Sequence, residues 1–468
     1  MLSSDVHDAT ITDDSHYRAL LSSYDKPGPR YTSYPTAIQF TEAFGPDDYV
    51  RVLNASDRDD PVSIYLHLPF CDERCLFCAC NTIISPDHDR VDWYVETLLR
   101  EIETVAGHLR HTRHAAQFHL GGGTPTYFSP PQLERILGSV LGHFPVHPGA
   151  ELSIEVDPRV TSDAHLELLA RFGFNRLSLG VQDLDPVVQQ AIHRIQPMEQ
   201  TRHVIDKGRE LGMHSVNIDL IYGLPHQNAT SFERTLDEVV ELRPDRLAIY
   251  SFAFLPSLKG HQRKLDRGAM PDRDGRYDLV GTARRVLGAA GYIDIGMDHF
   301  ALPTDELTIA QREGRLGRNF MGYTVHRAPD ILAFGTSSIG FFEGSYIQNT
   351  KKLNTYREAV EGGTLPVERG LTMTRDDKIR KAVIDDIMCN FHVDKTAVAA
   401  AWDIDFDAYF DRELNTLSSM VDDGLVQLTD TAIDMTPLGK HFVRNAAMHF
   451  DIYNRTSNGE APRFSRTV

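Results

Sequence analysis

Short apolar runs recur at regular intervals between residues 62 and 254, and longer amphipathic stretches separate them. Each short run spans seven to nine residues, which is typical of a strand buried in a sheet. We therefore predict six strands, at residues 62–68, 116–123, 151–158, 176–182, 215–223 and 246–254.

The intervening stretches carry apolar residues at helical spacing. In residues 92–109, for example, Tyr94, Leu98, Ile102 and Val105 fall on one face. Strands that alternate with helices form βα units, which build parallel sheets, and right-handed crossovers would give an open sheet or a partial barrel. We expect further helices at residues 129–144, 163–173, 199–212 and 231–242.

The two ends of the chain do not follow this rhythm. Residues 1–45 look like an N-terminal arm, with prolines in DKPGPRYTSYPT (25–36) that favour extended backbone. From about residue 373 the pattern predicts helices at 374–391, 405–424 and 438–451 and a small hairpin at 425–436, which together resemble a winged helix. Residues 403–430 hold many Asp and a single arginine, so we interpret this part as a packing or lid domain rather than a DNA-binding one. The predicted domains are the arm at 1–45, a catalytic barrel at 46–372 and a mostly helical C-terminal domain at 373–468.

The overall charge limits the partners. The 468 residues include 48 Lys and Arg against 66 Asp and Glu, a formal net charge of −18. An acidic surface repels nucleic acid and anionic lipid, so we expect neither as a partner. The start MLSSDVHDATITDD has no apolar stretch typical of a secretory signal, and no apolar run approaches the roughly 20 residues that span a bilayer. We expect a cytoplasmic monomer whose cysteines stay reduced.

Four of the five cysteines lie in the ten-residue stretch 71–80, inside the segment LHLPFCDERCLFCACN (66–81). Three other roles for these cysteines fit less well. A structural zinc site would need two separated pairs of ligands, and disulfides conflict with the reducing compartment that we expect. Ferredoxin loops use a different cysteine spacing. The spacing of Cys71, Cys75 and Cys78 fits three corners of a 4Fe–4S cluster whose fourth iron stays open to chelate S-adenosylmethionine. Cys80 follows Cys78 too closely to reach the far iron, so we predict that it is not a ligand; the alternative role is a small buried residue near the cluster.

Other unusual residues follow the predicted strands, where βα folds bind ligands. The glycine run GGGTPT (121–126) would let backbone approach a ligand. Glu155 would hold an amino group, Asp219 a ribose hydroxyl and Arg194 a carboxylate. Each residue alone is more often structural, but their shared location favours a site. Further candidates are Asp157, Gln182, and the strand pair Tyr65 and His67, of which His67 is more often a core residue.

Several longer motifs carry a specific resemblance. They are PRYTSYPTA (29–37), the cysteine loop, LGGGTPTYF, SIEVDPR, FNRLSLGVQD, NIDLIYGLPHQ, GMDHFA (296–301), RNFMGYT (318–324) and TRDDKIR. From about residue 25 to its end the chain resembles the oxygen-independent coproporphyrinogen III oxidases, or coproporphyrinogen dehydrogenases, of the radical S-adenosylmethionine superfamily. A related heme-chaperone group shares the cysteine loop but has an aromatic residue where Cys80 stands, so Cys80 and the PRYTSYPT arm favour the oxidases.

The resemblance implies a fold and a reaction. The fold would be a partial (β/α)6 barrel with an N-terminal arm and a helical C-terminal domain. The reaction would be oxidative decarboxylation of two propionates of coproporphyrinogen III to vinyl groups, giving protoporphyrinogen IX in heme biosynthesis by way of a 5′-deoxyadenosyl radical. A reduced flavodoxin or ferredoxin would supply electrons. The alternatives are a heme-binding chaperone or trafficking relative without this activity, and a plain electron carrier, which would need four protein ligands for its cluster.

The resemblance also implies roles for single residues, with two S-adenosylmethionine molecules bound. Family members read NFQGYT where this chain reads NFMGYT, and the thioether of Met321 fills the volume of the glutamine but donates no hydrogen bond. We expect Cys80, Met321 and Ile339 near the reacting groups. The first cofactor would contact Tyr65, Gly122, Glu155 and Ile339, and the second Phe77, Gly123, Thr124, Gln182, Arg194, Asp219 and Ala253.

The implied substrate carries four carboxylates, although the chain is acidic. Buried carboxylates need partners, so local cations must offset the global charge. The candidates are Arg30, Arg263, Lys264, His299, Arg312 and Arg318.

Overall fold

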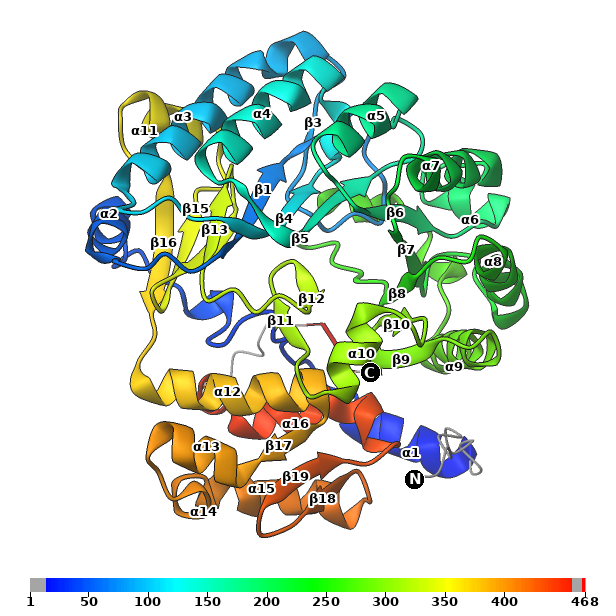
Figure 1. Cartoon of the computed structure of the whole chain (residues 1–468). Helices are drawn as coiled ribbons and strands as arrows, with labels where there is room; N and C mark the ends of the chain where they lie inside the picture. Colours follow the sequence, from blue (N-terminus) through cyan, green and yellow to red (C-terminus); the bar gives the residue numbers. More distant parts are fainter. Residues whose placement is uncertain (1–13, 457–464, 468) are drawn as a thin grey trace.

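A curved sheet of twelve strands organises the computed structural model, which describes residues 14–456 and 465–467 (Figure 1). Its centre consists of six parallel strands, each bonded to the next along the chain. They are β1 (Val62–Leu68), β4 (Ala115–Gly122), β5 (Val146–Val156), β6 (Arg176–Gln182), β7 (Ser215–Tyr222) and β8 (Arg246–Ser251). The predicted strands and the partial barrel are therefore confirmed.

Shorter strands, which the sequence pattern did not predict, extend the sheet at both edges. Beside β8 lie the antiparallel β10 (His299–Ala301) and β9 (Ile293–Gly296). Beside β1 lie β13 (Ile331–Phe334), which is parallel to it, and then the antiparallel β14 (Ile339–Phe342), β15 (Ser345–Asn349) and β16 (Val367–Thr372). A hairpin of β11 (Gly317–Asn319) and β12 (Gly322–Thr324) lies on the concave side of the sheet (Figure 1).

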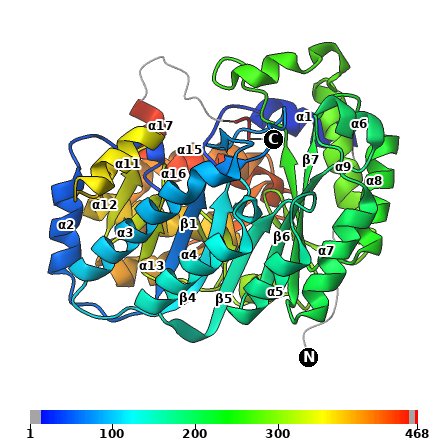
Figure 2. The same ribbon diagram turned by 90° about the horizontal axis from the view of Figure 1, so that it is seen from above.

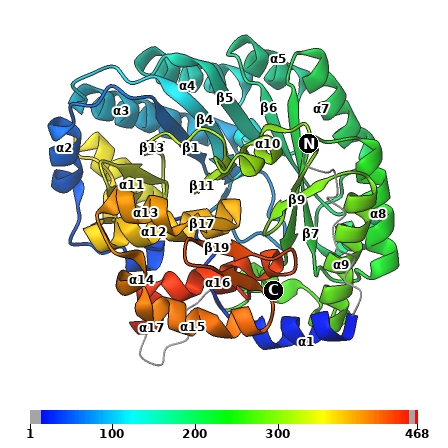
Figure 3. The ribbon, with the colours of Figure 1, turned by 60° about the horizontal axis from the view of Figure 1, so that its bottom comes forward.

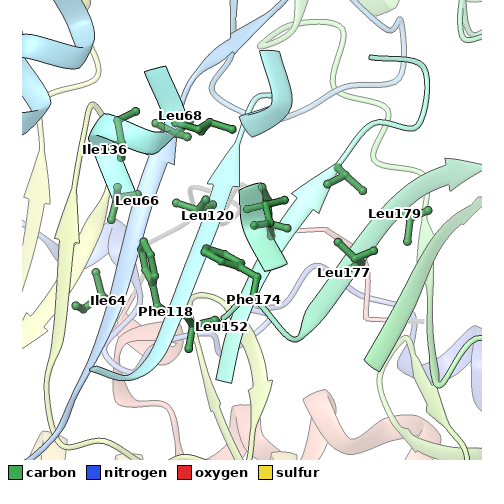
Figure 4. Packing of buried hydrophobic residues seen from close by; sticks show 14 of the residues in the cluster. Ile64, Leu66, Leu68, Phe118, Leu120, Ile136, Leu152, Phe174, Leu177 and Leu179 are labelled. Atoms are coloured by element: carbon green, nitrogen blue, oxygen red, sulfur yellow. The ribbon is translucent and has the colours of Figure 1, made fainter. Parts of the chain in front are cut away.

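Helices cover the convex face of the sheet (Figures 1 and 2). Alternate strand residues such as Leu66, Phe118, Leu152 and Leu177 point to this layer and are fully buried, where they pack near Ile136 of a covering helix (Figure 4). The helices are α2 (Pro46–Ala55), α3 (Asp92–His108), α4 (Pro130–His143), α5 (Asp163–Arg171), α6 (Pro186–Ala191), α7 (Met198–Glu210), α8 (Ala229–Glu241), α9 (Arg273–Ala289) and α11 (Leu353–Glu361).

The remaining strand residues face the concave side, because side chains alternate along a strand. They are polar: Tyr65 pairs in register with His119, and His119 with Ser153. At the amino ends of the strands, ion pairs fill this interior. Arg176 lies 3.4 Å from Glu151 and 2.5 Å from Glu306 of α10 (Glu306–Arg312). The carboxyl ends of the strands are consequently where a ligand can enter.

The C-terminal part lies across the open side of the curve (Figure 1). It contains α12 (Arg375–Asn390), α13 (Lys395–Trp402), α14 (Phe406–Tyr409), α15 (Asp411–Asp422), α16 (Val443–Phe450) and α17 (Ile452–Thr456). The predicted hairpin, β18 (Val426–Leu428) and β19 (Ala432–Met435), gains a third strand, β17 (His392–Asp394). The helix predicted at 405–424 breaks at Phe410 into α14 and α15. The mostly helical, winged-helix-like character is confirmed.

The arm packs against this C-terminal part rather than standing apart. Its helix α1 (Asp14–Tyr24) lies beside α15 and α16 (Figure 3). The Tyr24 ring lies 5.4 Å from that of Phe442, and its hydroxyl donates to Asp423 at 2.6 Å. The acidic start at 1–13 lies outside the described residues, and the boundaries at 45 and 373 stay predictions. None of the helices within the described ranges combines the length and apolar character needed to cross a membrane.

Candidate active site

The cysteine loop leaves the sheet directly after β1. Two very short parallel strands, β2 (Phe70–Cys71) and β3 (Ile83–Ile84), hold its ends together. The glycine run after β4 fixes its base, because the amide of Gly123 donates to the carbonyl of Leu68 at 2.8 Å and the amide of Thr124 donates to that of Phe70 at 2.9 Å. The first two strands of the barrel therefore present the loop and the glycines as one unit.

This unit forms one wall of a cavity of about 940 Å³ at the carboxyl ends of the strands. The convergence that the sequence predicted is thus present in the structure. Of the candidate residues, the cavity is lined by Cys71, Cys75, Phe77, Cys78, Cys80, Gly122, Gly123, Thr124, Glu155, Gln182, Arg194 and Asp219.

The cysteine thiols meet positive charge in this cavity. The thiol of Cys75 accepts from guanidinium nitrogens of Arg194 at 3.6 Å and of Arg159 at 3.7 Å. Both arginines also pair with Asp157, at 2.9 and 2.7 Å. Burial raises the pKa of Asp157, but Arg194 and Arg159 outweigh burial and hold it below its usual range. Cations beside a thiolate-bound cluster offset its negative charge, so the donor set fits an iron–sulfur cluster.

Arg159 was not among the sequence candidates, although it ends the SIEVDPR motif. Spacing alone did not indicate that it turns back toward Cys75.

The remaining thiols differ in acidity. The hydrogen bond from Cys80 lowers the pKa of Cys78 to about 6, and the same bond raises the pKa of Cys80 well above its usual value. Burial raises the pKa of Cys71 to about 11, against a hydrogen bond with the Thr124 hydroxyl at 3.4 Å. Cys80 is exposed to the cavity beside Cys78, and its exclusion from the ligand set stays a prediction.

The glycines are required by close approach of backbone. Gly122 has a φ of +115°, and its amide donates to a carboxylate oxygen of Glu155 at 3.2 Å. A Cβ on Gly123 would lie 2.6 Å from the carbonyl oxygen of Phe70. Side chains at these positions would displace the loop or fill the space that a ligand needs.

Two carboxylates in the cavity have opposite charge preferences. Burial raises the pKa of Glu155, but hydrogen bonds from His119 at 3.4 Å and from Gly122 outweigh burial and leave it below the usual value. Burial raises the pKa of Asp219 to about 7, although Asn217 donates to it at 2.8 Å. Glu155 is therefore ionised and suits an ammonium group, whereas Asp219 titrates near neutral pH.

Three further candidates, Tyr65, His67 and Ala253, lie close to this wall without lining the cavity. Tyr65 stacks on His119 with ring centroids 6.0 Å apart, and its hydroxyl bonds to His67, whose other ring nitrogen bonds to the carbonyl of Asn81. His67 is buried with both nitrogens bonded, as expected for a core residue. The carbonyl of Ala253 accepts from Gln262 at 3.1 Å, which also donates to the carbonyl of Phe77 in the loop.

Met321 and Ile339 lie elsewhere on the concave side. Met321 sits between β11 and β12, where its amide donates to Asn319 at 2.8 Å. Ile339 packs at a small apolar cluster that includes Phe40, Tyr346 and Met373. Neither side chain lines the cavity, so a role for either near the reacting groups stays a prediction.

The structure separates the cationic candidates into two groups. Arg30, His299 and Arg318 meet around the rings of Tyr250 and Tyr323. The other three, Arg263, Lys264 and Arg312, are exposed on the surface and do not join this group.

Comparisons with known proteins agree with this geometry. Residues 65–239 match the family model of the Radical SAM superfamily, and residues 373–442 match that of the HemN C-terminal domain. The chain is 42% identical to oxygen-independent coproporphyrinogen III oxidases of Pseudomonas aeruginosa, over 452 residues, and of Escherichia coli, over 450 residues; each alignment covers 96% of this chain and 98% of the relative. A solved structure described as "Coproporphyrinogen III oxidase (HemN) from Escherichia coli is a Radical SAM enzyme" has a TM-score of 0.89 and 41% identity, covering 93% of this chain and 98% of that one.

Proposed function

The chain belongs to the family of oxygen-independent coproporphyrinogen III oxidases within the Radical SAM superfamily, and we propose that it converts coproporphyrinogen III to protoporphyrinogen IX. The observation that carries this proposal is the cavity, which is lined by Cys71, Cys75 and Cys78 together with Glu155 and Asp219. The chain that forms it is similar to these enzymes over nearly its whole length. The reaction is an oxidative decarboxylation in heme biosynthesis.

Each of the two reacting propionates loses a hydrogen atom from its β-carbon, then CO2 and one electron, and becomes a vinyl group. When bound, a 4Fe–4S cluster and S-adenosylmethionine supply the one-electron cleavage that makes hydrogen abstraction possible. Cys71, Cys75 and Cys78 would hold the cluster. Glu155 and the amide of Gly122 would orient the amino-acid end of the cofactor.

Two S-adenosylmethionine molecules are part of the proposal. A cavity of about 940 Å³ is near the upper end of the usual range for one drug-sized ligand, about 300–1,000 Å³. Its polar groups form two sets, with Glu155 and Gly122 beside β4 and β5 and with Gln182, Arg194 and Asp219 beside β6 and β7. The first set suits one amino-acid end and the second suits another nucleoside.

An acidic electron carrier such as flavodoxin or ferredoxin would reduce the cluster. Residues 259–276 hold six Lys and Arg against three Asp, in a chain of net charge −18. This basic segment (residues 259–276) is tied to the cysteine loop, since Lys259 donates to the carbonyl of Cys80 at 2.8 Å and His261 bonds to the carbonyl of Cys78 at 2.8 Å. Charge complementarity at this position would bring a carrier close to the cluster.

The same proposal describes a cytoplasmic monomer with no nucleic-acid or membrane partner. The acidic charge supports this description, as do the cysteines, whose proposed role needs reduced thiols.

An anaerobic turnover assay tests the function. Reconstituted protein is incubated with coproporphyrinogen III, S-adenosylmethionine and a reductant, and the products are measured as protoporphyrin after oxidation and as CO2. We expect two CO2 per protoporphyrinogen, and none from the Cys75→Ser variant. Stoichiometric heme binding without any product from the intact protein would instead favour a heme-trafficking relative.

A further inference from the structure

A group of basic side chains lies on the concave side of the sheet, beyond the cofactor residues. Arg30 comes from the arm, His299 from β10 and Arg318 from β11. The guanidinium of Arg30 lies 5.7 Å from the ring centre of Tyr250, and that of Arg318 lies 4.6 Å from the ring centre of Tyr323. The His299 ring meets both tyrosines edge-on, at 5.9 and 5.1 Å. Segments far apart in sequence therefore build one cationic cluster, defined as Arg30, His299 and Arg318.

The charges of this cluster are only partly compensated. Arg30 forms an ion pair with Asp298 through a single nitrogen. Within the described part of the chain, Arg318 makes no ion pair or hydrogen bond, and its Nε and Nη1 atoms are buried without a partner. Arg444 of α16 adds a further guanidinium nearby, which is buried and bonded to the backbone carbonyls of Gly28 and Pro29. Buried, unpaired guanidinium groups are costly unless an anion joins them.

The cluster also has donors that remain open to a ligand. The Arg30 side chain keeps 31% of its surface accessible, and two of its three nitrogens bond to no described residue. Arg318 and His299 are likewise only partly covered, and the Nδ1 atom of His299 is buried without a partner among the described residues. Burial and the neighbouring arginines hold the pKa of His299 well below its usual value, so its ring is neutral and can donate through one nitrogen.

Tyr250 connects this cluster to the cofactor cavity. Its ring lines the cavity together with Asp219 and carries Arg30 against it. An anionic group held by Arg30 would therefore lie beside the wall of the cavity, within reach of a large molecule that also enters the cavity. The substrate of the proposed function is such a molecule, since it carries four carboxylates on one macrocycle.

We propose that Arg30 and Arg318, with His299, bind a propionate carboxylate of the substrate and so position the macrocycle against the cofactor cavity. This inference rests on the proposed function and adds to it the residues that select a polycarboxylate substrate. Arginine suits the task because its planar fork matches a carboxylate. The cluster acts on binding and orientation, while the cysteine loop and the cofactor residues remain responsible for the chemistry.

Binding of coproporphyrinogen III to the protein, kept anaerobic and loaded with its iron–sulfur cluster, tests the proposal, with Arg318→Gln and Arg30→Gln as variants. The matched control is Arg312→Gln, which removes an exposed arginine from α10. We expect Arg318→Gln and Arg30→Gln each to raise the Kd for coproporphyrinogen III about 10- to 100-fold, as for a lost charge-assisted hydrogen bond. We expect the control to stay within about twofold of the unchanged protein, and S-adenosylmethionine affinity to be unchanged in all of them.

The tetramethyl ester of coproporphyrinogen III separates carboxylate recognition from general damage. The esters carry no charge, so the unchanged protein and Arg318→Gln should bind the ester equally. Because Arg318 makes no hydrogen bond to the described residues, its replacement should not unfold the protein, and Arg318→Lys should recover part of the affinity for the free acid.

Equal affinity of all variants for the free acid would overturn the proposal, and so would an equal loss for acid and ester. These outcomes differ from failure of the proposed function. If the proposed function fails, the unchanged protein itself forms no protoporphyrinogen. If only the proposal for Arg30, His299 and Arg318 fails, the turnover of the unchanged protein stays intact.

Discussion

We predict that Asp219 makes the affinity for S-adenosylmethionine dependent on pH. Each of its oxygens already accepts one hydrogen bond, from Asn217 at 2.8 Å and from Ser178 at 3.4 Å. An ionised carboxylate has further lone pairs for ribose hydroxyls, whereas the protonated form loses much of this capacity. Burial raises its pKa to about 7, so the acceptor is only partly ionised at neutral pH.

The size of the effect follows from this pKa. A group with a pKa of about 7 is roughly 10% ionised at pH 6 and roughly 90% ionised at pH 8. If only the ionised form accepts from the ribose, the apparent Kd falls about tenfold from pH 6 to pH 8. Replacing Asp219 by Asn removes the charge and retains one acceptor oxygen. The variant should then bind about 10- to 100-fold more weakly at pH 8, as expected for a lost charged hydrogen bond worth about 1.5–3 kcal/mol.

Equilibrium binding of S-adenosylmethionine to the anaerobic, cluster-loaded protein measures this dependence at pH 6, 7 and 8. The ratio of the Kd of Asp219→Asn to that of the unchanged protein isolates the contribution of Asp219, since titration of the ligand affects both proteins. We expect this ratio to fall about tenfold from pH 8 to pH 6, where it should lie between about one and ten. A ratio that is constant across this range would refute the assignment of Asp219 as a titrating acceptor.

Three further predictions test other parts of the structure. Cys75→Ser should abolish the iron–sulfur absorbance and iron content, whereas Cys80→Ser should retain both; loss of the cluster in the second variant would mean that Cys80 is a ligand. Burial raises the pKa of Glu101 from 4.5 to about 7. Because the folded state then holds this proton more tightly than the unfolded state does, the free energy of unfolding should fall by about 3 kcal/mol as pH rises from about 4.5 through 7. Urea unfolding of apoprotein at pH 5 and pH 8 should show this loss, and Glu101→Gln should remove it. An equal fall in the free energy of unfolding of the variant between pH 5 and pH 8 would contradict the assignment to Glu101. Reversing the charges of Arg263 and Lys264 to Glu should slow turnover driven by flavodoxin several-fold, more so at low salt, while turnover driven by dithionite should stay the same.

The central barrel was predictable because its signals are local. Each parallel strand is a short run in which apolar residues recur at every second position, followed by a helical stretch, and the chemistry-bearing residues come at the ends of these runs. The sequence alone therefore places Cys71, Gly122, Glu155 and Asp219 together, since the carboxyl ends of parallel strands share one edge. The chain order of the strands is also their order in the sheet, so no long-range pairing had to be guessed.

The edges of the sheet were not predictable for the opposite reason. Strands β9 to β16 are three to six residues long, and several are held by partners far away in sequence, as β13 is by β1. A run as short as His299–Ala301 carries too few positions to show a period. The cationic candidates show the same limit. Charge balance predicted that some arginines must meet the substrate, but only the tertiary fold separates Arg30 and Arg318 from the exposed Arg263.

The proposed roles of these residues divide the molecule into a part for the cofactor and a part for the substrate. The proposed cluster ligands, Glu155 and Asp219 fall within residues 65–239, the segment that matches the Radical SAM superfamily. Arg30, His299 and Arg318 all fall outside it. The arm that carries Arg30 is fixed by the C-terminal part, because α1 packs on α15 and α16 and Arg444 bonds to the carbonyls of residues 28 and 29. The helical C-terminal part thus holds the arm, and with it Arg30, against the concave side of the sheet, where we propose that the substrate binds.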